Sequence, residues 1–185
     1  GVIVIPDILA NAGGVVVSLS GLPFLRDVRQ RFPEAVEATG YRQVAADWRF
    51  LCLHQAVEGA RVGPADFTFR NGSDVIRAAD LPAAFEAVLS GHIHRAQVLT
   101  HDLRRQPLAS PVVYPGSVER TSWAEREETK AYAILALKAA ARRWVLEWSP
   151  LPARDMIDVR VGPSPGRETL EAELQNHLHR VPSDA

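Results

Sequence analysis

The chain has 185 residues, a single cysteine and a formal net charge of −1. This length fits one domain, or one domain with a fragment of a second, and 46% hydrophobic residues suffice for a real core. The balanced charge argues against a broad basic surface for nucleic acid, although a local basic groove would be hidden in the sum. The single cysteine, Cys52, excludes an internal disulfide and a cysteine-based zinc site.

The predicted elements change character along the chain. Strands and helices alternate first and consecutive strands follow, which predicts an α/β fold with a mixed sheet or a two-sheet sandwich flanked by helices. The sequence begins directly with a predicted strand, without a disordered segment before it, which indicates an excerpt of a longer chain. The predicted strands are residues 2–5, 15–21, 49–53, 88–94, 97–101, 111–114, 131–137, 143–148 and 156–161. The predicted helices are residues 33–49, 80–87 and 168–180. Residues 58–80 are predicted to form a long loop.

A proline-rich joint, residues 149–154, predicts a boundary between a unit of residues 1–150 and a second unit of residues 151–185. No segment approaches the length of a transmembrane helix, and no signal peptide precedes the first residue. We therefore expect a cytoplasmic protein with no membrane partner.

Three histidines, His54, His92 and His94, stand where apolar runs end and loops begin. In open α/β sheets ligands bind outside the carboxyl ends of the strands, so two strands would deliver these side chains to one edge. In an extended segment, residues two apart face the same side, and Gly91 allows a close approach of the backbone. Spacing alone leaves two interpretations open, a metal cluster and a set of hydrogen-bonded structural histidines.

A second His-x-His pair, His177 and His179, provides an internal comparison. It lies in a segment with helical periodicity, where residues two apart diverge by about 200° and do not share a face. We predict that this pair is helix surface and that His101 is structural or exposed.

Several short motifs surround the first three histidines. They are Gly-Leu-Pro-Phe-Leu-Arg at 21–26, Leu-His-Gln at 53–55, Gly-His-x-His at 91–94, Tyr-Pro-Gly-Ser-x-x-Arg at 114–120 and Leu-Pro-Ala-Arg at 151–154. Together and in this order they resemble the calcineurin-like metallophosphoesterases, and within them the SbcD type of DNA-repair nuclease. The resemblance implies the C-terminal part of a metallophosphoesterase sandwich in residues 1–150 and the beginning of a small α+β DNA-capping domain in residues 151–185.

The resemblance also implies a site for two metal ions, usually manganese (Mn²⁺). By this likeness, His54 and His92 would hold one ion and His94 would help hold the other. Three motifs of the family do not occur in this chain: Asp-x-His, Gly-Asp-x-x-Asp and Gly-Asn-His-Asp/Glu. They would supply the bridging aspartate, an asparagine and the catalytic histidine, so we expect the isolated chain to be inactive and its longer parent to be active.

Three further residues have two interpretations each. Ser117 and Arg120, in the loop after Tyr114, would contact the DNA backbone, or would form a tight turn whose arginine pairs with a carboxylate such as Glu125 or Glu127. Arg95 would touch phosphate or be a solvated surface residue. The acidic run at 125–128 is predicted to be a solvated loop.

Three functions follow from these patterns. The first is a metal-dependent nuclease subunit in DNA repair, which cleaves double-stranded DNA ends or hairpins, forms a homodimer and works with an SMC-like coiled-coil ATPase of the SbcC type. The second is a phosphoesterase of the same superfamily that acts on small molecules. The third is a non-catalytic binding fragment.

Overall fold

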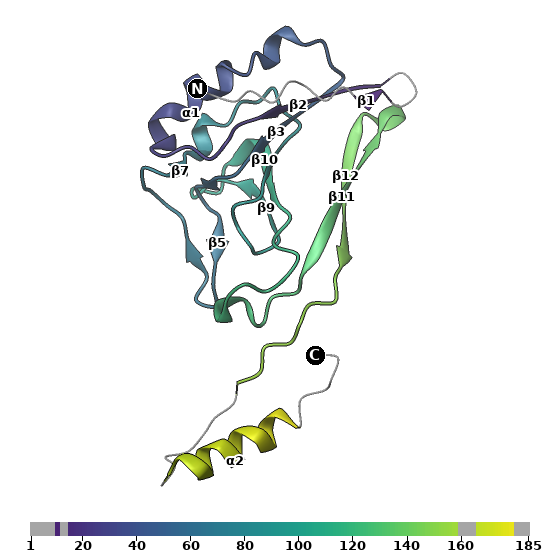
Figure 1. Ribbon diagram of the computed structural model, residues 1–185. Coiled ribbons are helices and arrows are strands. Elements are labelled where there is room, and N and C mark those ends of the chain that lie inside the picture. The colour runs from purple at the N-terminus through teal and green to yellow at the C-terminus, as the bar shows by residue number, and fades with distance from the viewer. Residues whose placement is uncertain (1–9, 12–14, 159–165, 180–185) are drawn as a thin grey trace.

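The computed structural model describes residues 10–11, 15–158 and 166–179 (Figure 1). Its centre is a six-stranded sheet whose four inner strands are parallel and whose two edge strands are antiparallel to their neighbours. This arrangement confirms an α/β fold with a mixed sheet. In spatial order the strands are β1 (Ala10–Asn11), β2 (Val16–Gly21), β3 (Trp48–Leu53), β8 (Ala87–Ser90), β10 (Pro107–Tyr114) and β9 (Gln97–His101).

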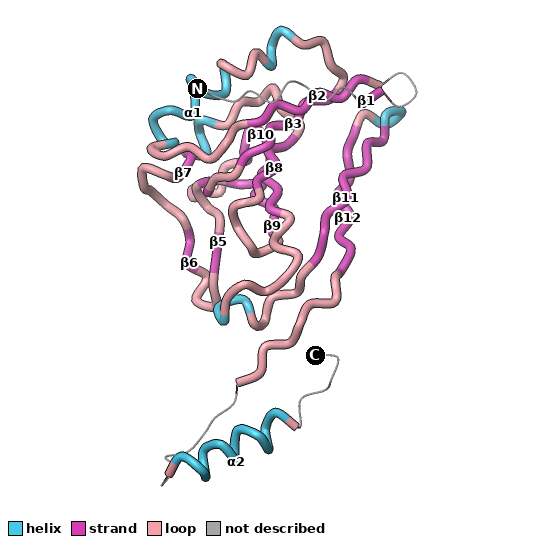
Figure 2. The backbone as a smooth tube through the Cα atoms, viewed as in Figure 1, coloured by secondary structure: helices cyan, strands magenta, loops and turns pink. Residues whose placement is uncertain are grey.

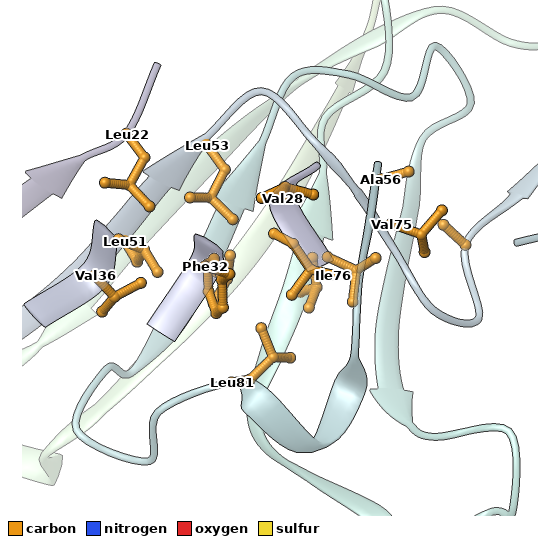
Figure 3. Packing of buried hydrophobic residues seen from close by; sticks show 14 of the residues in the cluster. Leu22, Val28, Phe32, Val36, Leu51, Leu53, Ala56, Val75, Ile76 and Leu81 are labelled. Atoms are coloured by element: carbon orange, nitrogen blue, oxygen red, sulfur yellow. The ribbon is translucent and has the colours of Figure 1, made fainter. Parts of the chain in front are cut away.

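One face of the sheet is covered by helix α1 (Val28–Glu37). The buried residues of α1 are spaced at i, i+4, i+7 and i+8, which places them on one side of a helix. They pack in one cluster with alternate residues of the central strands, as Figure 3 shows for Phe32 and Val36 beside Leu51. The predicted buried strands therefore have the covered face that their apolar runs require.

The opposite face of the sheet packs against a hairpin of β11 (Ala131–Lys138) and β12 (Arg143–Pro150) (Figure 1). The cross-strand pair Leu135 and Leu146 meets Trp48 and Phe50 in a second cluster, which holds residues that alternate with those of the first. The sheet is thus sandwiched between α1 and the hairpin.

The helix predicted at 33–49 is displaced. The observed helix begins at Val28, contains Pro33 as an interior residue and ends at Glu37. Gly40, with a left-handed φ of 69°, ends the turn and leads into the 3-10 helix η1 (Tyr41–Gln43). The prediction was wrong because Pro33 was assigned to a first turn, where proline is favoured, and because the apolar residues after Gly40 belong to η1 and to β3.

The predicted long loop at 58–80 contains short paired strands (Figure 2). β4 (Ala56–Val57) pairs with β7 (Val75–Ile76), and β5 (Arg61–Val62) pairs with β6 (Phe67–Thr68). The helix predicted at 80–87 does not form. A 3-10 helix, η2 (Ala78–Asp80), ends before Leu81, which is extended as expected for a residue that precedes proline.

The C-terminal helix is close to its predicted bounds, since α2 spans Arg167–Leu178. It contains His177, and His179 follows at its end, as predicted for the second His-x-His pair. Residues 156–158 have no regular structure, and the rest of the strand predicted at 156–161, like the strand at 2–5, lies outside the described residues. No helix in the described part of the chain combines the length and the apolar character needed to cross a membrane.

Replacement of a core residue tests the packing of α1. Phe32 is fully buried, so Phe32→Ala should lower the free energy of unfolding by about 3–5 kcal/mol. Phe67 is 61% exposed, so Phe67→Ala should change it by no more than about 0.5 kcal/mol. Urea unfolding followed by circular dichroism measures both, and equal losses would contradict the packing.

Candidate functional site

Three neighbouring parallel strands deliver the candidate residues to one edge of the sheet. β3 ends at Leu53, β8 at Ser90 and β10 at Tyr114, and the parallel register aligns these ends. His54 follows the first of them directly, and His92 and His94 follow the second in a loop rather than within the predicted strand. The three histidines thus lie beyond the carboxyl ends of parallel strands, as predicted from their places in the sequence.

His54 and His92 lie side by side at this edge. Their ring centroids are 5.2 Å apart and the rings meet edge to face at 79°. Two imidazoles bound to one tetrahedral ion stand on the order of 5 Å apart, given metal–nitrogen distances of about 2.0–2.1 Å. Burial, followed by the nearby His54 and His94, lowers the pKa of His92 and favours the neutral ring that a metal requires.

His94 takes a different set of partners. Its Nδ1 atom lies 3.1 Å from Oε1 of Glu125 and 3.0 Å from the Thr121 hydroxyl, and its side chain is 47% exposed. A cavity of about 320 Å³ opens beside His92 and His94 and is also lined by Phe69. In the described residues, no group of three or more histidine, cysteine, aspartate or glutamate side chains is arranged to hold a metal ion.

A buried polar cluster supports the backbone beneath the histidines. The Tyr114 hydroxyl donates to the carbonyl of Gln55 at 3.2 Å and accepts from the Val57 N–H at 2.9 Å. The Ser90 hydroxyl donates to the same Gln55 carbonyl at 2.8 Å, and the Gln55 side chain donates to the carbonyl of Leu25 at 2.8 Å. These bonds fix the chain immediately after His54 and explain the glutamine of the Leu-His-Gln motif.

The turn after β10 packs directly on the backbone of the His94 loop. Gly116 has a φ of 83°, and a Cβ atom there would lie 2.9 Å from the carbonyl oxygen of His94 and 3.0 Å from the nitrogen of Ala96. The N–H of Ser117 donates to the same His94 oxygen at 3.0 Å. Only glycine fits this contact, so the motif at 114–120 positions the histidine loop.

A buried ion pair lies behind His94 and was not anticipated. Glu125 and Lys130 have side-chain exposures of 9% and 1%, and Lys130 Nζ lies 2.7 Å from Glu125 Oε2. Burial disfavours the charged carboxylate, but hydrogen bonds from Lys130, His94, Thr121 and Ser122 outweigh it and hold the pKa of Glu125 well below its ordinary value. The prediction of a solvated loop was wrong for Glu125, because a run of charged residues does not reveal a buried partner five residues away.

The three residues considered for DNA contact all have protein partners. The Ser117 hydroxyl donates to the carbonyl of Glu119 at 2.7 Å and accepts a hydrogen bond from Lys130 Nζ at 2.9 Å. Arg95, whose side chain is 25% exposed, forms ion pairs with Asp66 and Glu128, so it is a paired residue at the surface.

Arg120 pairs with a carboxylate, as one of the two interpretations held, but with that of Asp155 rather than that of Glu125 or Glu127. Its guanidinium donates to the carbonyl of Arg154 at 2.5 Å and lies 3.7 Å from the carboxylate of Asp155. Arg120 therefore ties the joint after β12 to the loop after β10. His101, by contrast, is exposed and bonds to Thr100, as predicted for a surface histidine.

The chain matches no model of a known protein family, and no curated protein matches it.

Substitution of Gly116 tests the contact between the turn and the histidine loop. Gly40 is a matched control, because its φ of 69° is also left-handed but its nearest neighbour is a glutamine side chain at 3.7 Å. Gly40→Ala should lower the free energy of unfolding by about 1–2 kcal/mol from backbone strain. Gly116→Ala should lower it by about 1–3 kcal/mol more, because the neighbouring backbone must move. Equal losses in urea unfolding would refute the contact.

Acid titration tests the carboxylate of Glu125. Because its pKa is lower in the folded than in the unfolded chain, it stabilises the fold above its ordinary value of 4.5, and this contribution is lost as the pH falls through the folded value. Between about pH 7 and about pH 3, Glu125→Gln should therefore lose less stability than the unmodified chain. Glu127→Gln, at a carboxyl that is 83% exposed, should follow the unmodified chain. The measurement is the free energy of unfolding at each pH, and parallel curves for all three would contradict the expectation.

Proposed function

We propose that this chain is the histidine-bearing part of a two-metal phosphodiesterase that cleaves DNA, of the SbcD kind that its motifs resemble. The observation that carries the proposal is the pairing of His54 and His92, whose rings stand 5.2 Å apart beyond two neighbouring parallel strands. This spacing suits a shared ion, and the two rings stand at the edge of the sheet where such folds bind ligands.

The donor set fits part of a metal centre. His54 and His92 would hold one ion, and His94 would contribute to the second. Imidazoles with carboxylates suit manganese, iron or zinc better than magnesium. The described residues contain no further group arranged to complete either ion, so the bridging carboxylate and the remaining ligands would come from the motifs that this chain lacks.

Two divalent ions, when bound, supply a nucleophile at neutral pH and neutralise the charge that develops on phosphate. The chain's own residues bind and orient. His92 offers an unprotonated nitrogen because burial and its histidine neighbours lower its pKa. Gln55 and Tyr114 hold the backbone from which His54 extends, and Gly116 lets the next turn close over the His94 loop.

A phosphoesterase that acts on small molecules is a second candidate, because of one observation. Ser117, Arg120 and Arg95 are all engaged with protein groups, so the motif at 114–120 has a structural role that does not depend on DNA. The proposed partners, a double-stranded DNA end, a second copy of the parent protein and an SMC-like ATPase, rest on the motif resemblance. A cytoplasmic location also remains a prediction.

Calorimetry with Mn²⁺ tests the metal site. The 185-residue chain should bind manganese weakly, and a longer version that carries the three absent motifs should bind two ions tightly. The double substitution His92→Ala and His94→Ala should abolish this binding. The matched control is His177→Ala with His179→Ala, which removes the other His-x-His pair from helix α2 and should leave binding unchanged. If neither form binds manganese, or if both double variants bind equally, the histidines are structural.

Cleavage assays separate the two candidate functions. The longer version should degrade double-stranded DNA ends or hairpins only with Mn²⁺, whereas the 185-residue chain should be inactive on every phosphate ester. Robust cleavage by the short chain would contradict the incomplete site. Hydrolysis of a small phosphodiester without cleavage of DNA would favour the second candidate.

A further inference from the structure

Lys130 is a buried cation at the centre of a polar cluster behind the candidate site. Its side chain is 1% exposed and lies 2.7 Å from Glu125 and 3.3 Å from Glu128. A buried charge is costly unless it is paired and hydrogen-bonded, and an apolar pair of similar volume would often serve stability as well. The presence of an ion pair here therefore calls for a role beyond stability.

The carboxylate of Glu125 is shared between Lys130 and His94. One oxygen, Oε2, accepts from Lys130, and the other, Oε1, lies 3.1 Å from His94 Nδ1. The Thr121 hydroxyl donates its hydrogen to Oε1 at 2.8 Å, and Ser122 does so at 3.1 Å. The neighbours of His94 Nδ1 are therefore a carboxylate oxygen, which can only accept, and the Thr121 hydroxyl, which is placed to donate to that same oxygen.

This arrangement determines where His94 carries its hydrogen. A carboxylate has no hydrogen to donate, so the hydrogen between Glu125 Oε1 and the ring must belong to Nδ1 of His94. In the neutral ring, the lone pair is then on Nε2. That nitrogen is the one left for a further partner, on a side chain that is 47% exposed and lines the cavity beside His92.

The same lysine also holds the backbone of His94. Lys130 Nζ lies 3.4 Å from the carbonyl oxygen of His94 and donates to the Ser117 hydroxyl at 2.9 Å. The backbone N–H of Ser117 donates to that carbonyl at 3.0 Å. The ring and the main chain of His94 are thus both held through the buried ammonium group of Lys130.

We propose that Glu125 and Lys130 are positioning residues that hold His94 in the Nδ1–H form, with the lone pair of Nε2 available to a divalent cation. A histidine that binds a metal ion commonly donates its other ring N–H to a carboxylate, which fixes the tautomer and the orientation of the ring. The part of the inference that concerns the cation rests on the proposed function, whereas the part that concerns the tautomer does not. Lys130 acts on the ring of His94 through Glu125.

The test compares the unmodified chain with two variants, each labelled with ¹⁵N-histidine. Glu125→Leu with Lys130→Met removes the pair without leaving a buried charge unpaired, and Glu125→Gln keeps an acceptor oxygen. Nitrogen chemical shifts of the metal-free chain report which ring nitrogen of His94 carries hydrogen. His94 should be protonated at Nδ1 in the unmodified chain, lose this preference in the double variant and recover it in part with glutamine. The shifts of His92 should not change and serve as the internal control.

Manganese calorimetry provides the second readout. In the form of the protein that binds Mn²⁺, the double variant should bind about 10–100-fold more weakly. The proposal is overturned if unmodified His94 carries its hydrogen on Nε2, which requires no variant to fold. It is also overturned if the folded double variant keeps the Nδ1–H form or the full affinity. If the unmodified protein in either length binds no manganese, the proposed function fails, and the shifts of His94 still decide whether Glu125 and Lys130 set the tautomer.

Discussion

Parallel pairing of β3, β8 and β10 is the constraint on which the candidate site depends. Parallel strands in adjacent positions must end at the same edge, and here three of them end within one layer of loops. A shift of one residue in either register would turn every side chain of that strand to the opposite face. It would move Leu51 or Val88, which are fully buried on the α1 side, to the side of the hairpin and disrupt both apolar clusters that flank the sheet, so these clusters also fix the positions of His54 and His92.

Buried polar groups then connect the ends of the strands to the adjoining loops. Tyr114 and Ser90 reach from β10 and β8 to the carbonyl of Gln55, which follows β3. Each bond joins a strand end to a neighbouring loop, and each is buried. Removal of one partner would therefore leave a buried polar group without a hydrogen bond, at a cost of about 1–3 kcal/mol. These buried hydrogen bonds hold the loops that carry the histidines, which suits residues that must present side chains at fixed distances.

Much of this architecture could be predicted from local pattern. Continuous apolar runs identified β2 and β3, because a strand covered on both faces must be apolar throughout. Helix α1 was misplaced because proline suits a first turn and is unfavourable in the interior, whereas the packing of Val28 and Phe32 in the core extends the helix on the N-terminal side of Pro33. The short strands between Ala56 and Ile76 escaped prediction because two-residue ladders leave no periodicity.

The site divides in the same way. His54 and His92 could be paired in advance, since each follows a strand and strand ends converge. The orientation of His94 toward Glu125 could not, because it depends on Lys130, whose burial comes from the return of the chain into β11 rather than from its neighbours in sequence.

The short motifs that suggested a nuclease prove to be supports for the histidines more than contacts for a substrate. Gly116 allows the approach of two backbones, Ser117 joins the lysine cluster, and Arg120 ties the loop to the carbonyl of Arg154. Under the proposed function, discrimination between a DNA end and a smaller ester would have to come from groups that line the cavity beside His92, where Phe69 and other apolar side chains meet the histidines. The turn at 114–120 positions the histidine loop, and the cavity wall is the surface that a substrate of the proposed enzyme would contact.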